Sequence, residues 1–353
     1  AGVFEIADEF IDTVAKHHPL SATHMGIPGF DHLMADWSPE ANEAFHADVR
    51  TSLMEMDGAQ PANERERMCK DTFVEELSLS LEQYESREHL RDMNVLFSPI
   101  QQARSIFDLM PQDSVEAWEN IASRMEKIGE ALSGYRTTLD VGRSEGFVTS
   151  QRQVSGCIEQ CDVWAGSGDL QPFFDSLVNA LAASDINDDS LSTRIEDAAA
   201  AATAAYGEMA EYLRDSYLPV ATPVDGVGRD RYALAARGYL GAELNPEETY
   251  DWGWEQLAWV RSEMTGTAAQ IKPGASIGEA VEILDSDPAK MITGEDEFRQ
   301  WMQDLQDRTI EAMDGVHFDI PEPVRKIEAL IAPPGGALAM YYTGPSEDFS
   351  RPG

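Results

Sequence analysis

Several patterns that are common in membrane proteins and enzymes are missing from this sequence. No apolar run approaches the roughly eighteen residues that a membrane-spanning helix needs. The first ten residues, AGVFEIADEF, have neither the basic nor the apolar segment of a secretory signal. There is no P-loop, no dinucleotide-binding glycine pattern, no C-x-x-C and no H-E-x-x-H zinc pattern. We therefore assign no catalytic and no metal-binding residue from motifs.

Basic residues, and lysine above all, are also scarce. The 353 residues include 26 lysines and arginines against 64 aspartates and glutamates, a net charge of −38. Such a surface repels phosphate backbones and anionic lipids, so we expect neither a nucleic-acid nor a membrane partner. High acidity with little lysine suits a salt-rich habitat, and a GC-rich genome also favours arginine over lysine. Both explanations stay open, and neither reveals function.

Cysteine is the third scarcity. Cys69, Cys157 and Cys161 make a poor disulfide framework, and a cytoplasmic location fits them best. Cys157 and Cys161 are four residues apart, which places both thiols on one face of a helix. A structural zinc site needs two more ligands, and no histidine or cysteine lies nearby. We therefore interpret the pair as small residues of a helical core.

What the sequence contains is mostly helix. Apolar residues make up 42%, enough for a large core, and from about 113 to 140 they recur at threes and fours. Asp113 or Ser114 can cap that helix, and Gly142 offers its stop. Further helices are predicted to begin at Pro39, to run from Pro246 to about 271, and to end before Pro219 after an alanine run at 199–202 that permits close helix packing. The predicted fold is mainly α, a large multi-helix body with long antiparallel helices.

The amino-acid composition changes after Gly315, and the helical repeat of apolar residues ends there. Prolines, glycine pairs and β-branched or aromatic residues predict short strands at about 316–320, 324–330 and 337–343, forming a small sheet or hairpin near the C-terminus. The predicted domains are a helical body over 1–314, with a possible subdomain break near 142–188, and a strand and loop segment over 315–353.

Two groups of polar residues are candidates for chemistry. His17, His18, His24 and His32 lie within sixteen residues, but Pro19, Pro28 and Gly29 interrupt the stretch, so loop and surface roles are favoured over a metal site. The second group lies in the final segment, YYTGPSEDFSRPG. On a strand, Tyr341 and Tyr342 would point to opposite faces, which leaves one hydroxyl free for a cleft. Arg351 is the only base there, and it could clamp a carboxylate or pair with Glu347 or Asp348.

Several segments, in order along the chain, resemble a bacterial family catalogued as domain of unknown function 885, whose members look like zinc metallopeptidases. These segments are HPLSATHMGIPGFDHLMADWSPE, QQARSIFDLMP, GRDRYALAARGYLGAELNPEETYDWGWEQL, HFDIP and the closing YYTGPSEDFSRPG. The last is the most specific of them, because the family typically has an aromatic strand, a Pro-Ser turn and Arg-Pro-Gly there.

The resemblance implies that family members continue into a second strand and a helix with a His-Glu-x-x-x-Pro-Gly-His-type motif, whose histidines would hold zinc. It also implies a likeness to helical carboxypeptidase Taq and thimet oligopeptidase enzymes, with a deep cleft beside a small sheet. This sequence ends before that motif, so no metal or catalytic residue is transferred to it. The resemblance implies that the missing C-terminal half of the same protein is a partner.

We therefore predict the N-terminal, cleft-forming part of a zinc-dependent peptidase-like hydrolase, which by itself would be inactive. Tyr341, Tyr342 and Arg351 are the predicted substrate-binding residues, and the substrate is a peptide or another small amide. Zinc is expected for the full-length family protein and not for this chain. The alternative prediction is a non-catalytic, acidic helical binding module.

Overall fold

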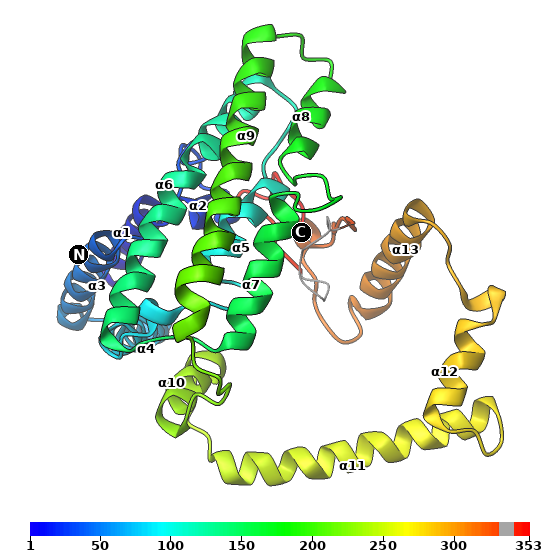
Figure 1. The fold of residues 1–353 in the computed structure, drawn as a ribbon. Helices are drawn as coiled ribbons and strands as arrows, with labels where there is room; N and C mark the ends of the chain where they lie inside the picture. Colours follow the sequence, from blue (N-terminus) through cyan, green and yellow to red (C-terminus); the bar gives the residue numbers. More distant parts are fainter. Residues whose placement is uncertain (332–341) are drawn as a thin grey trace. The chain divides into compact units, whose positions relative to one another are not determined.

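The computed structural model describes residues 1–331 and 342–353, and these are mainly α-helical (Figure 1). Short 3₁₀ turns and one π turn connect some of the helices. No helix in this described part is both long and apolar enough to span a bilayer. The α-helices found in it are α1 (Val3–His17), α2 (Pro19–Met25), α3 (Pro39–Gly58), α4 (Glu64–Glu85), α5 (Pro99–Ser105), α6 (Val115–Glu145), α7 (Gln151–Trp164), α8 (Asp175–Ala182), α9 (Asp189–Tyr212), α10 (Arg229–Leu240), α11 (Pro246–Ile271), α12 (Ile277–Asp285) and α13 (Glu295–Met313).

The helix predicted over 113–140 is α6, and its start follows the predicted chemistry. The Ser114 hydroxyl accepts a hydrogen bond from the Ala117 N–H at 3.2 Å, which satisfies a free donor of the first turn. The predicted stop at Gly142 is wrong, because α6 continues to Glu145 and ends at Gly146. Gly142 lies inside the helix where the Leu90 carbonyl oxygen would be 2.3 Å from an added Cβ. This glycine serves a close approach between segments.

Helices α6 and α9 pack side by side and carry most of the main core (Figure 1). The predicted alanine run lies on α9, where Ala199 and Ala202 are buried. Small side chains let helices approach closely, and α9 contacts α6, α7 and α8. Trp118 and Tyr206 are fully buried in this core. Helices α1, α3 and α4 enclose two smaller apolar clusters.

The chain divides into two compact units, residues 1–227 with 333–353, and residues 228–332. The first contains α1 to α9 and the described final residues 342–353. The second contains α10 to α13. This division differs from the predicted boundary between 314 and 315, because the terminal residues join the first helical unit.

The predicted C-terminal sheet is wrong for the residues that the structure describes. No strand is found in 1–331 or 342–353, where the β-bridges seen are isolated ones. Residues 316–320 continue a turn in which the Gly315 N–H bonds the Phe318 carbonyl at 2.8 Å, and Glu322–Val324 is a 3₁₀ turn. Pro321 and Pro323 lack the N–H groups that a ladder requires, which explains why β-branched residues nearby form no strand. Of the third predicted strand, 337–341 lies outside the described residues, and 342–343 is not strand.

Candidate functional site

The last residues of the chain fold into a compact loop. The Ser346 N–H donates to the Arg351 carbonyl at 3.1 Å, and the Arg351 N–H donates back to the Ser346 hydroxyl oxygen at 2.9 Å. Asp348 accepts from the Ser346 hydroxyl and from the Ser350 N–H, and these hydrogen bonds lower the pKa of Asp348 to about 2. Ser346 is buried although its neighbours are polar. We call residues 344–353 the terminal loop.

The terminal loop is held against the end of α2, more than 300 residues earlier. The Glu347 N–H donates to the Met25 carbonyl at 2.9 Å, and Nη2 of Arg351 donates to the His24 carbonyl at 2.9 Å. Gly26 has a φ of +78°, and a Cβ added there would lie 2.5 Å from the Cβ of Ser346. Only glycine combines this backbone conformation with this close contact. The terminal loop therefore packs directly on the C-terminal end of α2, which carries His24.

A buried arginine of α6, Arg124, forms hydrogen bonds with the segment 19–33, which includes α2. Arg124 is fully buried, and it donates through Nη2 to the Thr23 hydroxyl oxygen at 2.6 Å and through Nε to the Leu33 carbonyl at 2.9 Å. The Thr23 hydroxyl donates onward to Asp31 at 2.6 Å. Burial lowers the pKa of Arg124 to about 10, so the group stays charged at neutral pH. Its Nη1 is buried without a hydrogen-bond partner among the described residues.

Sequence reasoning overlooked Arg124, although a signal for it exists. It lies three residues after Ile121 and four before Ile128, on the apolar stripe of α6. A charged residue on a buried stripe requires polar partners. Here the partners are carbonyl and hydroxyl oxygens of the segment 19–33.

The three predicted substrate-binding residues, Tyr341, Tyr342 and Arg351, differ in their surroundings. Tyr342 is 62% exposed, and its ring lies against Gly353 at the end of the terminal loop. Arg351 donates to the carbonyls of His24 and Gly344. Among the described residues neither Glu347 nor Asp348 forms an ion pair with it, so the alternative of a pairing within the loop is not found there. Tyr341 lies outside the described residues.

The histidines that are clustered in the sequence between 17 and 32 have different surroundings in the structure. His17 bonds Asp48 through Nε2 at 2.8 Å, and the ring of His18 packs edge-on against Phe45. The pKa of His24 is lowered by partial burial, then by the charges of Arg351 and Arg124, so this ring is neutral at pH 7. In the described part of the chain no three histidine, cysteine or acidic side chains gather in a way that could hold a metal ion. Cys157 and Cys161 are both buried thiols with raised pKa values.

A second histidine arrangement was not foreseen. The ring of His46 on α3 stacks on Tyr84 of α4 with centroids 3.9 Å apart, and His89 stacks on the other side of this tyrosine at 4.4 Å. His18 lies nearby, against Phe45 of α3. Burial is the main cause that lowers the pKa of His18, His46 and His89, and it lowers that of His18 and His89 to about 4. Neutral rings are therefore part of the packing between α1, α3 and α4.

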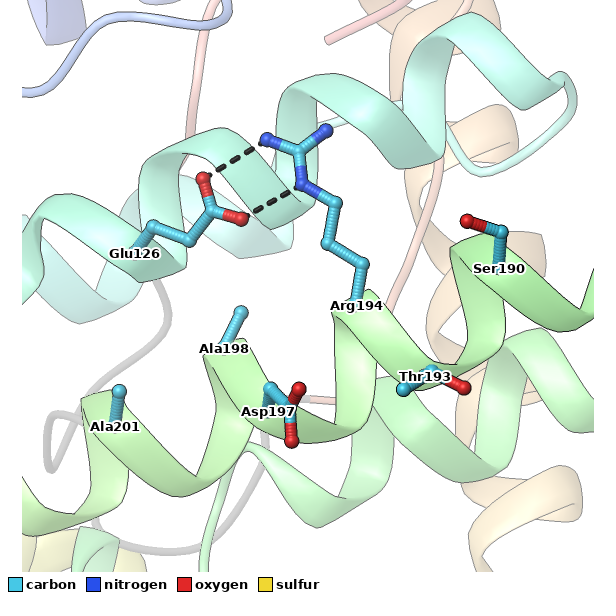
Figure 2. A pocket seen from close by; sticks show the side chains of 7 residues that line it. All are labelled: Glu126, Ser190, Thr193, Arg194, Asp197, Ala198 and Ala201. Atoms are coloured by element: carbon cyan, nitrogen blue, oxygen red, sulfur yellow. Dashed lines mark hydrogen bonds and ion pairs between the residues drawn. The ribbon is translucent and has the colours of Figure 1, made fainter.

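A surface groove and a serine motif each resemble a functional site, but contacts between neighbouring residues account for both. A groove of about 540 Å³ runs along α6 and α9, and Figure 2 shows that Glu126 and Arg194 lie in it as a bidentate ion pair, with N–O distances of 2.7 and 2.8 Å. Both charges are satisfied by each other. The letters GASIG at 274–278 fit the nucleophile pattern G-x-S-x-G, which normally follows a strand. Here Ser276 caps α12 by accepting from the Glu279 N–H at 3.2 Å.

The chain is similar to one protein-family model and to solved structures of two bacterial proteins. The model of a family described as "Bacterial protein of unknown function (DUF885)" matches residues 19–353. No curated protein is significantly similar in sequence. One solved structure, "the putative lipoprotein from Colwellia psychrerythraea", matches with a TM-score of 0.77 and 17% identity, over 99% of this chain and 66% of that one. "A putative lipoprotein of unknown function from Shewanella oneidensis" matches with a TM-score of 0.60 and 15% identity, over 98% and 65%. The chain spans about two thirds of each of these proteins, and at such identities the likeness shows the fold alone.

Proposed function

The chain belongs to the bacterial DUF885 family, and on that premise we propose that it forms the substrate-binding part of a zinc-dependent, peptidase-like hydrolase. The observation that supports this most directly is the terminal loop, which is docked on α2 and leaves the Tyr342 side chain exposed beside it. A tyrosine beside a fixed loop can offer its hydroxyl to a ligand with little loss of entropy.

The proposal gives the named residues separate roles. Tyr342 donates its hydroxyl hydrogen to a carbonyl of the bound peptide or small amide. Arg351 is a positioning residue, because it donates to two backbone carbonyls and thereby holds the terminal loop to α2. In the proposal, its other guanidinium N–H groups bind a substrate carboxylate. A contact from Tyr341 stays a prediction.

Zinc does not fit the residues that the structure describes, since they contain no cluster able to hold a metal ion. The proposal therefore derives no catalytic step from them. In it, zinc is held by polypeptide other than the described residues, and the missing C-terminal half of the same protein is the proposed source.

The test uses the product of the complete reading frame that contains this sequence, loaded with zinc and assayed on a library of fluorogenic peptides. We expect hydrolysis, and a loss of at least tenfold in kcat/KM for Tyr342→Phe. Arg351→Ala should raise KM more than it lowers kcat, because the terminal loop is released from α2.

Matched controls are available in the chain. Tyr239 is 88% exposed, so Tyr239→Phe should leave turnover unchanged. Arg152 forms an exposed ion pair with Asp225, and Arg152→Ala should also be neutral. If Tyr342→Phe behaves like Tyr239→Phe, the role of Tyr342 is wrong.

The alternative function is a non-catalytic acidic binding module, and the observation that favours it is the lack of a metal-holding cluster among the described residues. Zinc analysis of the complete product separates the two proposals. A product that binds zinc and cleaves peptides supports the hydrolase, whereas a zinc-free, inactive product supports the module.

The cytoplasmic location stays part of the proposal, and the two similar structures give a reason to test it. Both are described as lipoproteins, and a covalent lipid anchors a protein to a membrane. Cell fractionation with and without high salt decides: the protein in the soluble fraction agrees with the proposal, and retention with membranes until detergent is added contradicts it.

A further inference from the structure

Residues 228–332 expose an unusual amount of apolar surface. Of the 35 large apolar side chains that are exposed among the described residues, 22 lie in this unit. Within 228–331, the part of this unit that the structure describes, the buried apolar residues are Ala268, Ala275 and Ala280. Isolated apolar residues on a surface are normal, but contiguous apolar faces mark binding surfaces. This unit therefore has helices without a core of its own to cover them.

Helix α11 is apolar on two sides. Tyr250, Trp254 and Leu257 follow one another at spacings of four and three, and they lie on one side of the helix with exposures of 65, 56 and 42%. Trp252 and Trp259 are seven residues apart, so they share a different side, and both are 59% exposed. A surface helix that faces water needs only one apolar side. An apolar residue set on two sides is typical of a helix that is packed on both of them.

Helix α12 covers only part of α11 and leaves a groove of about 370 Å³ between them. Met264 and Ile271 of α11 and Val281 and Leu284 of α12 are among its lining residues. Glu263 is the one charged residue in that lining. An apolar groove with one charge at its side suits the apolar face of an amphipathic helix, which would insert side chains at i, i+3 or i+4, and i+7.

Charge and length argue for the identity of the occupant. Residues 228–332 contain 21 acidic and 10 basic residues, so a second copy and an anionic bilayer are both repelled. About a third of the polypeptide in each of the two similar structures is additional to the part that this chain matches. We propose that the apolar sides of α11 and its groove with α12 are a docking surface for a helical segment equivalent to that additional third. This inference goes beyond the proposed function and holds whether or not the protein hydrolyses peptides.

The experiment compares residues 1–353 with the product of the complete reading frame. Trp252, Trp254, Trp259 and Trp301 are 43–59% exposed, whereas Trp118 and Trp164 are buried, so acrylamide quenching reports mainly on α11 and α13. In the complete product we expect the quenching constant to fall at least twofold. We also expect hydrogen exchange of the amides in 246–271 to slow at least tenfold.

Paired variants separate docking from folding. Trp259→Ser with Met264→Ser should lower the melting temperature of the complete product by several degrees and leave that of residues 1–353 nearly unchanged. Leu170→Ser, at a 51% exposed leucine of the other unit, should change neither. The proposal is overturned by equal quenching in both proteins, by a reading frame that ends at Gly353, by a dimer of residues 1–353 that Trp259→Ser dissociates, or by binding of residues 1–353 to neutral or anionic vesicles.

Discussion

The fully buried tryptophans lie in the first unit, which also has the half-buried Trp37, and the exposed tryptophans lie in the second unit. Trp118 and Trp164, in residues 1–227, are at most 2% exposed, while the four tryptophans of residues 228–332 are 43–59% exposed. Trp118 lies on α6, and Trp252, Trp254 and Trp259 lie on α11; both are long helices whose first turn is capped by a side chain. The difference is the packing within each unit: α6 has α9 beside it, whereas in the described part of 228–332 the neighbour of α11 is the short helix α12. A helix sequence specifies an apolar side, but only a neighbouring element makes that side a core.

The largest expected effect is in the first unit. Trp118→Ala removes a fully buried side chain whose indole N–H donates to the Gln112 carbonyl at 3.0 Å. The cavity and the lost hydrogen bond should lower the free energy of unfolding by about 3–5 kcal/mol. Urea denaturation followed by circular dichroism measures it. A loss below about 1 kcal/mol would mean that the core around α6 is not packed as described.

Acid should also destabilise the first unit selectively. His18, His46 and His89 have lowered pKa values, so the folded state stays neutral where the unfolded state takes up protons. Their contribution is fully present above about pH 6.5 and is lost as the pH falls toward about 4. Burial raises the pKa of Asp92 to about 6, which acts in the opposite direction.

A variant isolates the histidine contribution. Between pH 7 and pH 4.5 the wild type should lose about 2 kcal/mol more free energy of unfolding than His89→Gln, given at most about 1.4 kcal/mol per pH unit for one histidine. Urea titrations at the two pH values measure the difference. Parallel pH profiles for the two proteins would contradict the role of a neutral His89.

A glycine pair tests whether the terminal loop belongs to the first unit. Gly26→Ala forces a side chain toward Ser346 as well as an unfavourable φ, and should cost about 2 kcal/mol and expose 344–353 to proteases. Gly29→Ala imposes a similar backbone strain at φ +91°, but nothing lies within 4 Å of its Cβ position. Gly29→Ala should cost about 1 kcal/mol and leave the loop protected. Equal proteolysis of the two variants would show that the loop is not docked at Gly26.

The smallest effect is expected in residues 228–332. Trp254→Ala removes as large a side chain as Trp118→Ala does, but from a position that is 56% exposed. In residues 1–353 the free energy of unfolding should change by no more than about 0.5 kcal/mol. Urea denaturation under the same conditions as for Trp118→Ala gives the comparison. A cost above 2 kcal/mol would show that α11 is buried and would remove the contrast between the units.

Local chemistry made part of this structure predictable. Ser114 caps α6, and Asn245 with Pro246 begins α11, because side-chain oxygens and proline act on the first turn wherever the helix lies. The same local reasoning failed after Gly315, where β-branched residues indicate strands. A strand needs a hydrogen-bonded partner, and neither prolines nor isolated bridges supply one in the described residues.

The candidate site was only half visible in the sequence. Tyr342 and Arg351 stand in a distinctive segment, YYTGPSEDFSRPG, and could be named from it. Their surroundings could not, because contacts across 327 residues, such as that of Arg351 with the His24 carbonyl, follow from the path of the whole chain. Arg124 is intermediate: its place on an apolar stripe is visible, but its oxygen partners are not.

A mainly α, highly acidic protein with recognisable helix starts follows from the amino-acid sequence alone, because propensity, capping and charge act over a few residues. The folded chain is needed to show which apolar sides are buried, that Arg351 binds backbone carbonyls instead of the nearby carboxylates, and that the terminal loop contacts α2. Burial and long-range hydrogen bonds depend on which segments meet, and that is set by the packing of the whole chain.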